Sequence, residues 1–226
     1  MSNRALWLAC CFLGISGCNT SSIFGDTPQP VSVDVAFWGS VLEVGSVSRV
    51  CAFGMASWGL AVATHQVEAW TLSDPTLAKI DQMPDPADRY ACILVRPVRP
   101  GLLTVTARMA GLDGVNTVRL IPAIKTVQVS PSALTLNIGD TASIAATVIT
   151  VDSDTLRDVP ILWRESDYGV VSNVVFYGIG AATRSVVQAD AIGQNIVTAA
   201  AATSRQDSAT NVKGQARVTV IPRPIP

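Results

Sequence analysis

The sequence repeats itself. "LEVGSVSRV", ending at Val50, matches "LNIGDTASI", ending at Ile144, and "WTLSDPTLAKI" from Trp70 matches "WRESDYGVVSNV" from Trp163. Further along, "GLLTVTARM" matches "GQNIVTAAA" and "VRLIP" matches "VTVIP", with an offset that stays between about 92 and 100 residues. Because four matches keep one order and one period, the sequence predicts two copies of a single module.

Short β-strands are predicted throughout both copies. Apolar residues alternate with small or polar ones, Gly, Pro, Asp and Asn mark the turns, and no stretch shows a helical period. The best examples are "VSVDVAF", "ILVRPV", "LLTVTARM", "TVQVSP", "TASIAATVIT" and "ARVTVIP". About 95 residues, some seven strands and a tryptophan in mid-module fit an immunoglobulin-like (Ig-like) sandwich, with a fibronectin-type sandwich as the alternative. The predicted fold class is therefore all-β, with two tandem β-sandwiches.

The second copy also resembles a known family. "VQVSPSALTLNIGDTASIAATV", then W-x-x-S-D, "GQNIVTA" and "VTVIP", is similar to the bacterial Ig-like domain of group 2, which also occurs in intimin and invasin adhesins and other envelope proteins. The first copy matches well only at "WTLSDPTLAKID" and "GLLTVTA". Both copies depart from the family in longer segments before the later glycine, "QMPDPADRYACILVRPVRP" and "VFYGIGAATRSVVQADAI".

Several repeated residues are expected to have structural roles in such a sandwich. Trp70 and Trp163 are expected to fill the space between the sheets, where an aromatic ring buries about 150–250 Å². Gly45 and Gly139 suit a turn that needs positive φ. The pairs Ser73-Asp74 and Ser166-Asp167 are expected to hydrogen-bond nearby backbone in the following turn.

The N-terminus has the layout of an export signal. Asn3 and Arg4 precede "ALWLACCFLG", and this run of about ten apolar residues is short of the roughly 20 that a spanning helix needs. The next segment, "ISGC", resembles the lipobox of bacterial lipoproteins, in which the cysteine receives acyl chains such as palmitate and becomes the first residue. The resemblance implies lipidation at Cys18; the alternative is an ordinary signal peptide whose cleavage site happens to adjoin a cysteine.

The chain is expected to divide into five segments. They are a signal peptide (1–17), the lipidated cysteine with a flexible linker (18–30), two Ig-like domains (31–122 and 123–222) and a tail (223–226). The linker reaches at most about 40 Å at roughly 3.3 Å per residue, so we expect the modules to lie close to the membrane. Asn19 stands where some lipoproteins retained at the inner membrane have aspartate, which favours the outer membrane.

Composition argues against nucleic acid as a partner. The 16 Lys and Arg balance 17 Asp and Glu, and no basic run offers a surface for a phosphate backbone. Charged residues make up only 15% of the chain and the mean hydropathy is +0.38. Two explanations are open: β-rich modules full of Val and Ala, or a surface partly covered by a partner.

The cysteines have different expected fates. Cleavage before Cys18 discards Cys10 and Cys11, which leaves Cys51 and Cys92 as the free thiols of the exported chain. In an oxidising envelope these two are predicted to form a disulfide between the second and fifth strands, neighbours in one sheet. Two separate buried thiols are the alternative.

Residues with catalytic or metal-binding chemistry are few. His65 is the only histidine, which excludes a His-based metal site and makes it indispensable to any catalytic triad. "GMASWG" misplaces its serine for a nucleophile elbow, and "GIGAAT" lacks the third glycine of a dinucleotide loop. Asp152, Asp154 and Asp158 have the spacing of Ca²⁺ ligands but lack the glycine and glutamate of a Ca²⁺ loop, so we interpret them as a solvated turn.

These features predict a lipid-anchored protein of the bacterial cell envelope, at the periplasmic face or at the outer membrane and cell surface. We expect a non-catalytic binding or structural module without cofactor or metal. Two modules on a short linker fit an accessory subunit of a membrane-associated complex, bound to another envelope or membrane protein. The resemblance implies an alternative, a cell-surface adhesin or carbohydrate-binding protein, and a remote alternative is a hydrolase that uses His65.

Overall fold

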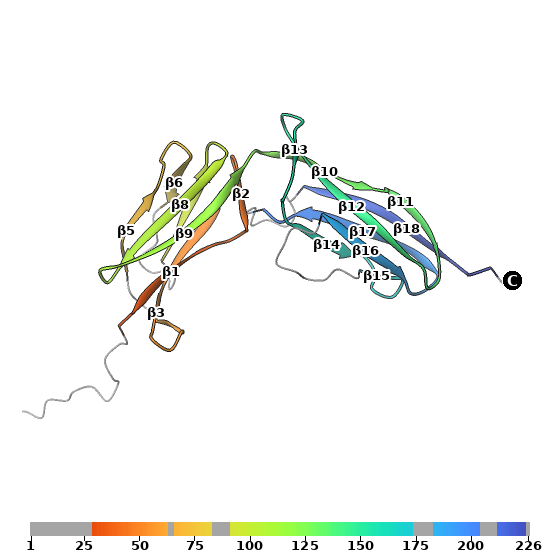
Figure 1. The fold of residues 1–226 in the computed structure, drawn as a ribbon, viewed down its shortest axis with the longest axis horizontal. Coiled ribbons are helices and arrows are strands. Elements are labelled where there is room, and N and C mark those ends of the chain that lie inside the picture. Colours follow the sequence, from red (N-terminus) through yellow and green to blue (C-terminus); the bar gives the residue numbers. More distant parts are fainter. Residues whose placement is uncertain (1–28, 63–65, 83–90, 174–182, 204–211, 225–226) are drawn as a thin grey trace, which may run out of the picture.

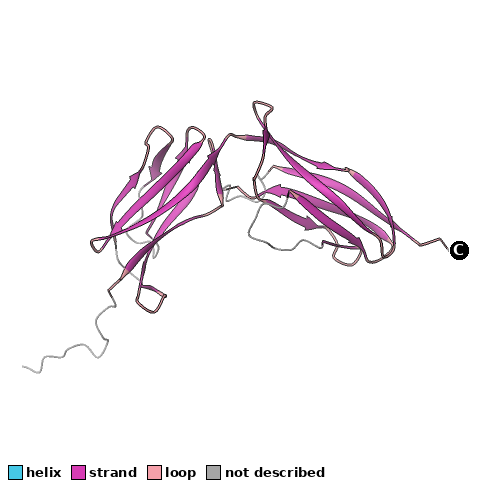
Figure 2. Cartoon of the chain, in the orientation of Figure 1, coloured by secondary structure: helices cyan, strands magenta, loops and turns pink. Residues whose placement is uncertain are grey.

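The computed structural model describes residues 29–62, 66–82, 91–173, 183–203 and 212–224. These residues form β-strands, turns and loops, and the strands assemble into two sandwiches that follow one another along the chain (Figures 1 and 2). No helix in this described part is long and apolar enough to cross a membrane. The predicted all-β fold with two tandem Ig-like sandwiches is confirmed.

The described residues of the first module form nine strands. They are β1 (Ser32–Phe37), β2 (Val41–Glu43), β3 (Ser48–Met55), β4 (Ala61–Val62), β5 (Val67–Leu72), β6 (Ala78–Gln82), β7 (Ala91–Pro97), β8 (Gly101–Met109) and β9 (Leu112–Ile121).

The second module also contains nine strands among the described residues. They are β10 (Ile124–Ser130), β11 (Ala133–Asn137), β12 (Thr141–Thr150), β13 (Thr155–Leu156), β14 (Ile161–Glu165), β15 (Val171–Asn173), β16 (Arg184–Ala189), β17 (Gly193–Ala201) and β18 (Lys213–Ile221).

Both modules have the same topology. In the first, one sheet has the order β1-β3-β7-β6, with β4 added to β3, and the other has the order β2-β9-β8-β5. In the second, the corresponding orders are β10-β12-β16-β15, with β13 added to β12, and β11-β18-β17-β14. This is the Ig arrangement, in which strands A, B, E and D face strands G, F and C.

The first two strands of each module belong to different sheets. β1 pairs antiparallel with β3, whereas the following β2 pairs parallel with β9 in the opposite sheet. β10 and β11 repeat this, with β11 parallel to β18. The chain therefore crosses from one sheet to the other after Phe37 and again after Ser130.

Each core is formed by the inward face of alternating strands. In β8, for example, Leu103, Val105, Ala107 and Met109 are buried in the first core, and the residues between them are more exposed. Successive side chains of a strand point to opposite faces, so this alternation places every second residue between the sheets. The two modules have separate hydrophobic clusters, which contain mainly Val, Ile, Leu and Ala.

Candidate functional site

The two repeated glycines occupy equivalent turns. Gly45 has φ +80° and Gly139 has φ +89°, backbone conformations that favour glycine. The Gly45 amide donates a hydrogen bond to the Pro97 carbonyl at 3.0 Å, and the Gly139 amide donates to the Ala189 carbonyl at 2.8 Å. The two glycines lie in the turns that follow β2 and β11. Each hydrogen bond joins its turn to the last residue of a strand in the facing sheet, β7 in the first module and β16 in the second.

The two repeated tryptophans differ in burial. Trp163, on β14, is buried within the second core. Trp70, on β5, is only partly buried against the first core, and its indole Nε1 is buried without a hydrogen-bond partner among the described residues. Trp70 therefore fills the space between the sheets less completely than the sequence analysis expected.

The Ser-Asp pairs stabilise the turn after β5 and the turn after β14 in the same way. Each serine hydroxyl accepts a hydrogen bond from a neighbouring strand, and each aspartate accepts one from the amide two residues on, as in an Asx turn. The bonds run from Thr104 N to Ser73 Oγ (3.0 Å), Thr76 N to Asp74 Oδ1 (2.8 Å), Ile196 N to Ser166 Oγ (3.1 Å) and Gly169 N to Asp167 Oδ1 (2.8 Å). The Thr76 bonds hold the pKa of Asp74 below its ordinary value.

Cys51 and Cys92 are joined by the predicted disulfide. They lie directly opposite each other on β3 and β7, with their Cα atoms 4.0 Å apart. These are strands B and E of the Ig arrangement, the second and fifth when A is counted once and the short β4 is left out. Val50 and Ala52 belong to the hydrophobic cluster, so alternation puts the intervening Cys51 on the opposite face of its sheet. The disulfide thus links two neighbouring strands on the face turned away from the hydrophobic cluster, although both cysteines are buried, at 3% and 8% exposure.

A buried carboxylate connects the two modules. Glu43, the last residue of β2, is only 1% exposed. Its Oε1 accepts a hydrogen bond from the amide of Ile124 at 2.8 Å, and Ile124 is the first residue of β10 in the second module. The Thr203 hydroxyl lies 3.5 Å from Oε2. A buried charge is costly unless it is hydrogen-bonded, and Glu43 obtains such bonds across the module boundary.

Apolar and backbone contacts reinforce this junction. Val41 and Ile121, on strands of the first module, pack in the hydrophobic cluster of the second. The Arg119 guanidinium donates to the Arg157 carbonyl at 3.0 Å. The last strand of the first module and the first strand of the second are separated only by residues 122 and 123. The junction is therefore a packed contact that includes Glu43, which the sequence analysis did not single out.

A further polar contact ties the far end of the second module. Asp140 accepts hydrogen bonds from the Asn137 side chain (2.9 Å) and amide (3.2 Å), and Arg223 lies 3.2 Å from its other carboxylate oxygen. The bonds from Asn137, and then the Arg223 guanidinium, hold the pKa of Asp140 below its ordinary value. This carboxylate stabilises the Gly139 turn in its ionised form.

The remaining candidates do not form a reaction centre in the described part of the chain. Asp152, Asp154 and Asp158 are exposed in the turns around β13, and no described group of three or more His, Cys, Asp or Glu side chains is arranged to hold a metal. Ser57 of "GMASWG" lies in a hairpin turn. His65, Cys18 and most of "GIGAAT" lie outside the described residues.

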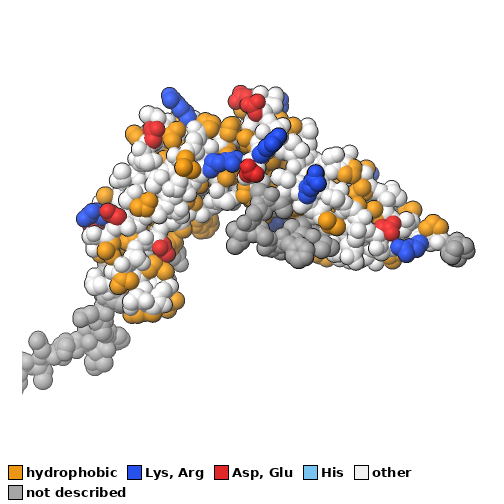
Figure 3. Space-filling view, in the orientation of Figure 1, with side chains coloured by type: hydrophobic (Ala, Val, Ile, Leu, Met, Phe, Trp, Pro, Cys, Tyr) orange, Lys and Arg blue, Asp and Glu red, His pale blue; other side chains and the backbone are white. Residues whose placement is uncertain are grey.

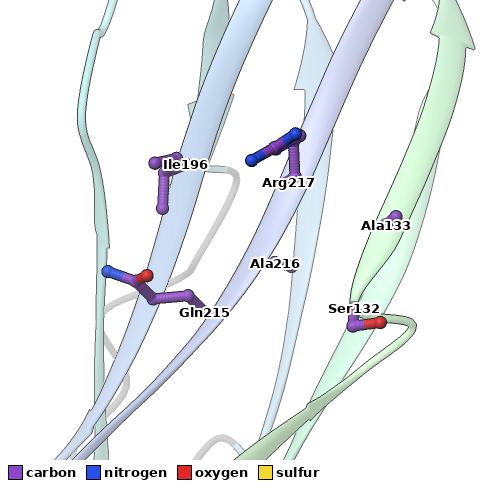
Figure 4. Close-up of a pocket in the computed structure, with 6 residues that line it drawn as sticks. All are labelled: Ser132, Ala133, Ile196, Gln215, Ala216 and Arg217. Carbon is purple, nitrogen blue, oxygen red and sulfur yellow. The ribbon is translucent and has the colours of Figure 1, made fainter.

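One shallow hollow lies on the outer face of the second module (Figure 4). It has a volume of about 350 Å³ and lies over β11, β17 and β18. Most of its lining residues are exposed, and Arg217 supplies the only charged group among them: Ser132, Ala133, Ile196, Gln215, Ala216 and Arg217. Such a surface offers contact area and a cation, and it contains neither a nucleophile beside a base nor a carboxylate pair.

Solvent-exposed apolar side chains are widespread on both modules. Charged side chains are scattered singly or in small groups over the visible face, between many apolar and uncharged ones (Figure 3). The most exposed of the large apolar residues, each at least 59% accessible, are Val31, Trp58, Leu60, Leu102, Val115, Tyr168 and Ile192. Single exposed apolar residues are common on protein surfaces, whereas contiguous apolar patches mark contact sites.

No protein-family model matches the sequence, and no curated protein matches it. Among solved structures, domains 4 and 5 of the S-layer protein SbsC are similar, with 12% identity, a TM-score of 0.37, and coverage of 85% of this chain and 99% of that one. The Yersinia pseudotuberculosis adhesin InvE has 20% identity and a TM-score of 0.36, and the match covers 83% of this chain and 58% of InvE. The D0-D1 domain of intimin has 16% identity and a TM-score of 0.34, with coverage of 82% and 97%. Similarities this distant carry nothing about function.

Proposed function

We propose that this chain is a lipid-anchored cell-envelope protein that acts as a non-catalytic binding or structural module, as an accessory subunit of a membrane-associated protein complex. The observation that carries the proposal is the placement of two joined sandwiches directly after the lipobox-like "ISGC". β1 begins at Ser32, which follows Cys18 by 14 positions in the sequence.

The surface of the modules supports a binding role. On the outer face of the β2-β9-β8-β5 sheet, Leu102 is 66% exposed and Val115 is 60% exposed, and threonines lie between them. Protein contact surfaces are poor in charge at their centre and polar at their rim. The row between Leu102 and Val115 is uncharged, because Thr104 and Thr117 bond each other there through their hydroxyls at 2.9 Å, and Arg119 lies opposite Leu102.

The packed junction supports a structural role. Glu43, Val41 and Ile121 hold the second module against the first, so a partner that binds one module also positions the other. A pair of modules in fixed relation presents one extended surface to a complex.

Crosslinking in native membranes tests this proposal. A photo-crosslinking residue at Leu102 is expected to capture the same partner reproducibly, whereas the same residue at Thr76, in an exposed polar turn, is the matched control and captures it much less. Recovery of only free monomer from both positions contradicts a role in a complex. Digestion of the protein on intact cells by external protease instead favours the adhesin alternative.

A further inference from the structure

The hairpin between β3 and β4 carries a compact apolar tip, which we define as Ala56–Leu60. The Gly59 amide donates to the Ala56 carbonyl at 2.9 Å, and the Ala56 amide donates to the Leu60 carbonyl at 2.9 Å. Gly59 has φ +80°, the conformation that closes a tight three-residue hairpin loop. These bonds fix the direction in which the tip projects.

The tip exposes large apolar side chains with no charge among them. Trp58 is 63% exposed and Leu60 is 66% exposed. From Gly54 to Val62 the sequence is "GMASWGLAV", which contains no charged residue. The charges described at this end lie on neighbouring strands: Asp34 on β1 is opposite Phe53, and Arg108, next to the turn between β8 and β9, pairs with both Glu68 and Asp113 at 3.4 Å. The apolar tip is therefore free of charge, while the neighbouring turn is polar.

The tip lies at the end of the first module where β1 begins (Figure 1). Val31, itself 59% exposed, donates its amide to the Met55 carbonyl at 2.8 Å, and Pro30 lies against Gly54. Trp58 comes three residues after Met55, which places it up to about 10 Å beyond this point at roughly 3.3 Å per residue. Figure 3 shows apolar side chains gathered at the same end of the module.

The length of chain between Cys18 and Pro30 limits where this end can be. Twelve residue steps span at most about 40 Å at roughly 3.3 Å per residue. An acylated Cys18 lies at the bilayer surface, so the end of the module that carries the tip is the end held nearest to lipid. Tryptophan and leucine without neighbouring charge are the residues that partition into the boundary between headgroups and acyl chains.

We infer that Ala56–Leu60 is a membrane-contact tip, and that Trp58 and Leu60 insert into the interface of the bilayer that holds the acyl anchor. This inference rests on the proposed lipid anchor and adds a second point of attachment. Two points of contact orient the first module on the membrane and direct the second module away from it.

Quenching of tryptophan fluorescence by brominated lipid tests the inference. The full chain is expressed in bacteria, purified in its mature form, and reconstituted into phosphatidylethanolamine and phosphatidylglycerol vesicles with and without brominated acyl chains. We expect brominated vesicles to quench the wild type, Trp58→Phe to lose that quenching, and Trp38→Phe to retain it. Trp38 is the matched control because it is 56% exposed at the opposite end of the β1 and β3 pair. Both substitutions lie on the surface, so unchanged unfolding curves verify that the fold is intact.

The outcomes separate the tip from the anchor. An acylated protein that floats with vesicles but shows no Trp58-dependent quenching overturns the membrane-contact tip and leaves the anchor. A protein without acyl mass that still shows Trp58-dependent quenching overturns the anchor and supports the tip. If Trp58→Phe instead abolishes a dimer or a protein crosslink while lipid quenching is absent from the wild type, the tip is a protein contact and the inference is wrong.

Discussion

Replacing Glu43 by alanine removes the carboxylate at the junction of the two modules. Ile124, which is 5% exposed, then keeps a buried amide without its acceptor, and an unsatisfied buried donor costs about 1–3 kcal/mol. The contact to Thr203 adds little, because 3.5 Å is at the limit of a hydrogen bond. Loss of a buried charge recovers some desolvation energy, so we expect a net loss of about 2 kcal/mol in the free energy of unfolding.

Glu43→Gln is the matched control for this experiment. Its amide oxygen can still accept from Ile124, so we expect it to cost less than about 1 kcal/mol. Urea unfolding of both variants gives the free energies, and small-angle X-ray scattering reports whether Glu43→Ala broadens the distribution of overall dimensions. Equal stability of Glu43→Ala and the wild type, together with identical scattering, refutes the role of Glu43 at the junction.

Three further predictions concern single modules. Cys51→Ala with Cys92→Ala opens a loop of 41 residues and is expected to lower the free energy of unfolding by about 4 kcal/mol through loop entropy; a urea unfolding curve equal to that of the wild type contradicts this. Trp163→Ala should destabilise by about 3–5 kcal/mol, whereas Trp70→Phe should be nearly neutral since its indole N–H has no partner among the described residues; a reversed order in thermal denaturation refutes the packing difference. Folding lowers the pKa of Asp140, so its contribution to the free energy of unfolding is present at neutral pH and is lost as the pH falls through that lowered pKa. Asp140→Asn should therefore weaken the loss of stability at acid pH, measured by unfolding across a pH series. An unchanged dependence of stability on pH contradicts this.

The sequence predicts the parts of the fold that have long, regular strands. The segment "TASIAATVIT" coincides with β12, because alternation over ten residues identifies both the strand and its buried face. The nearly constant offset between matching segments predicts that the two copies share one strand topology, and the strand orders of the two modules agree. The Cys51–Cys92 bridge was predictable because these are the two cysteines that remain after the expected export cleavage, and the alignment of the copy to an Ig sandwich placed them on neighbouring strands.

Other features depend on contacts that a linear pattern does not contain. β2, β4, β13 and β15 have three residues or fewer, too short for alternation to show, and so the change of sheet after β1 was not predicted. Glu43 carried one visible signal, a charge inside the apolar "VLEVG", but its partner Ile124 is brought close only by the packing of two modules. Asn195 is a second buried polar residue whose partner the linear pattern does not reveal. It lies where the first copy has Leu103, and its side-chain oxygen accepts hydrogen bonds from the amide and the hydroxyl of Ser166.

The central claim of the account is that an acylated residue tethers this pair of sandwiches to a membrane. Mass spectrometry of the protein purified from membranes of the expressing bacteria tests it most directly. We predict an N-terminal peptide that starts at Cys18 and carries the added mass of a diacylglycerol, and a Cys18→Ser variant that carries none. An unmodified Cys18, or a chain that retains residues 1–17, contradicts the account.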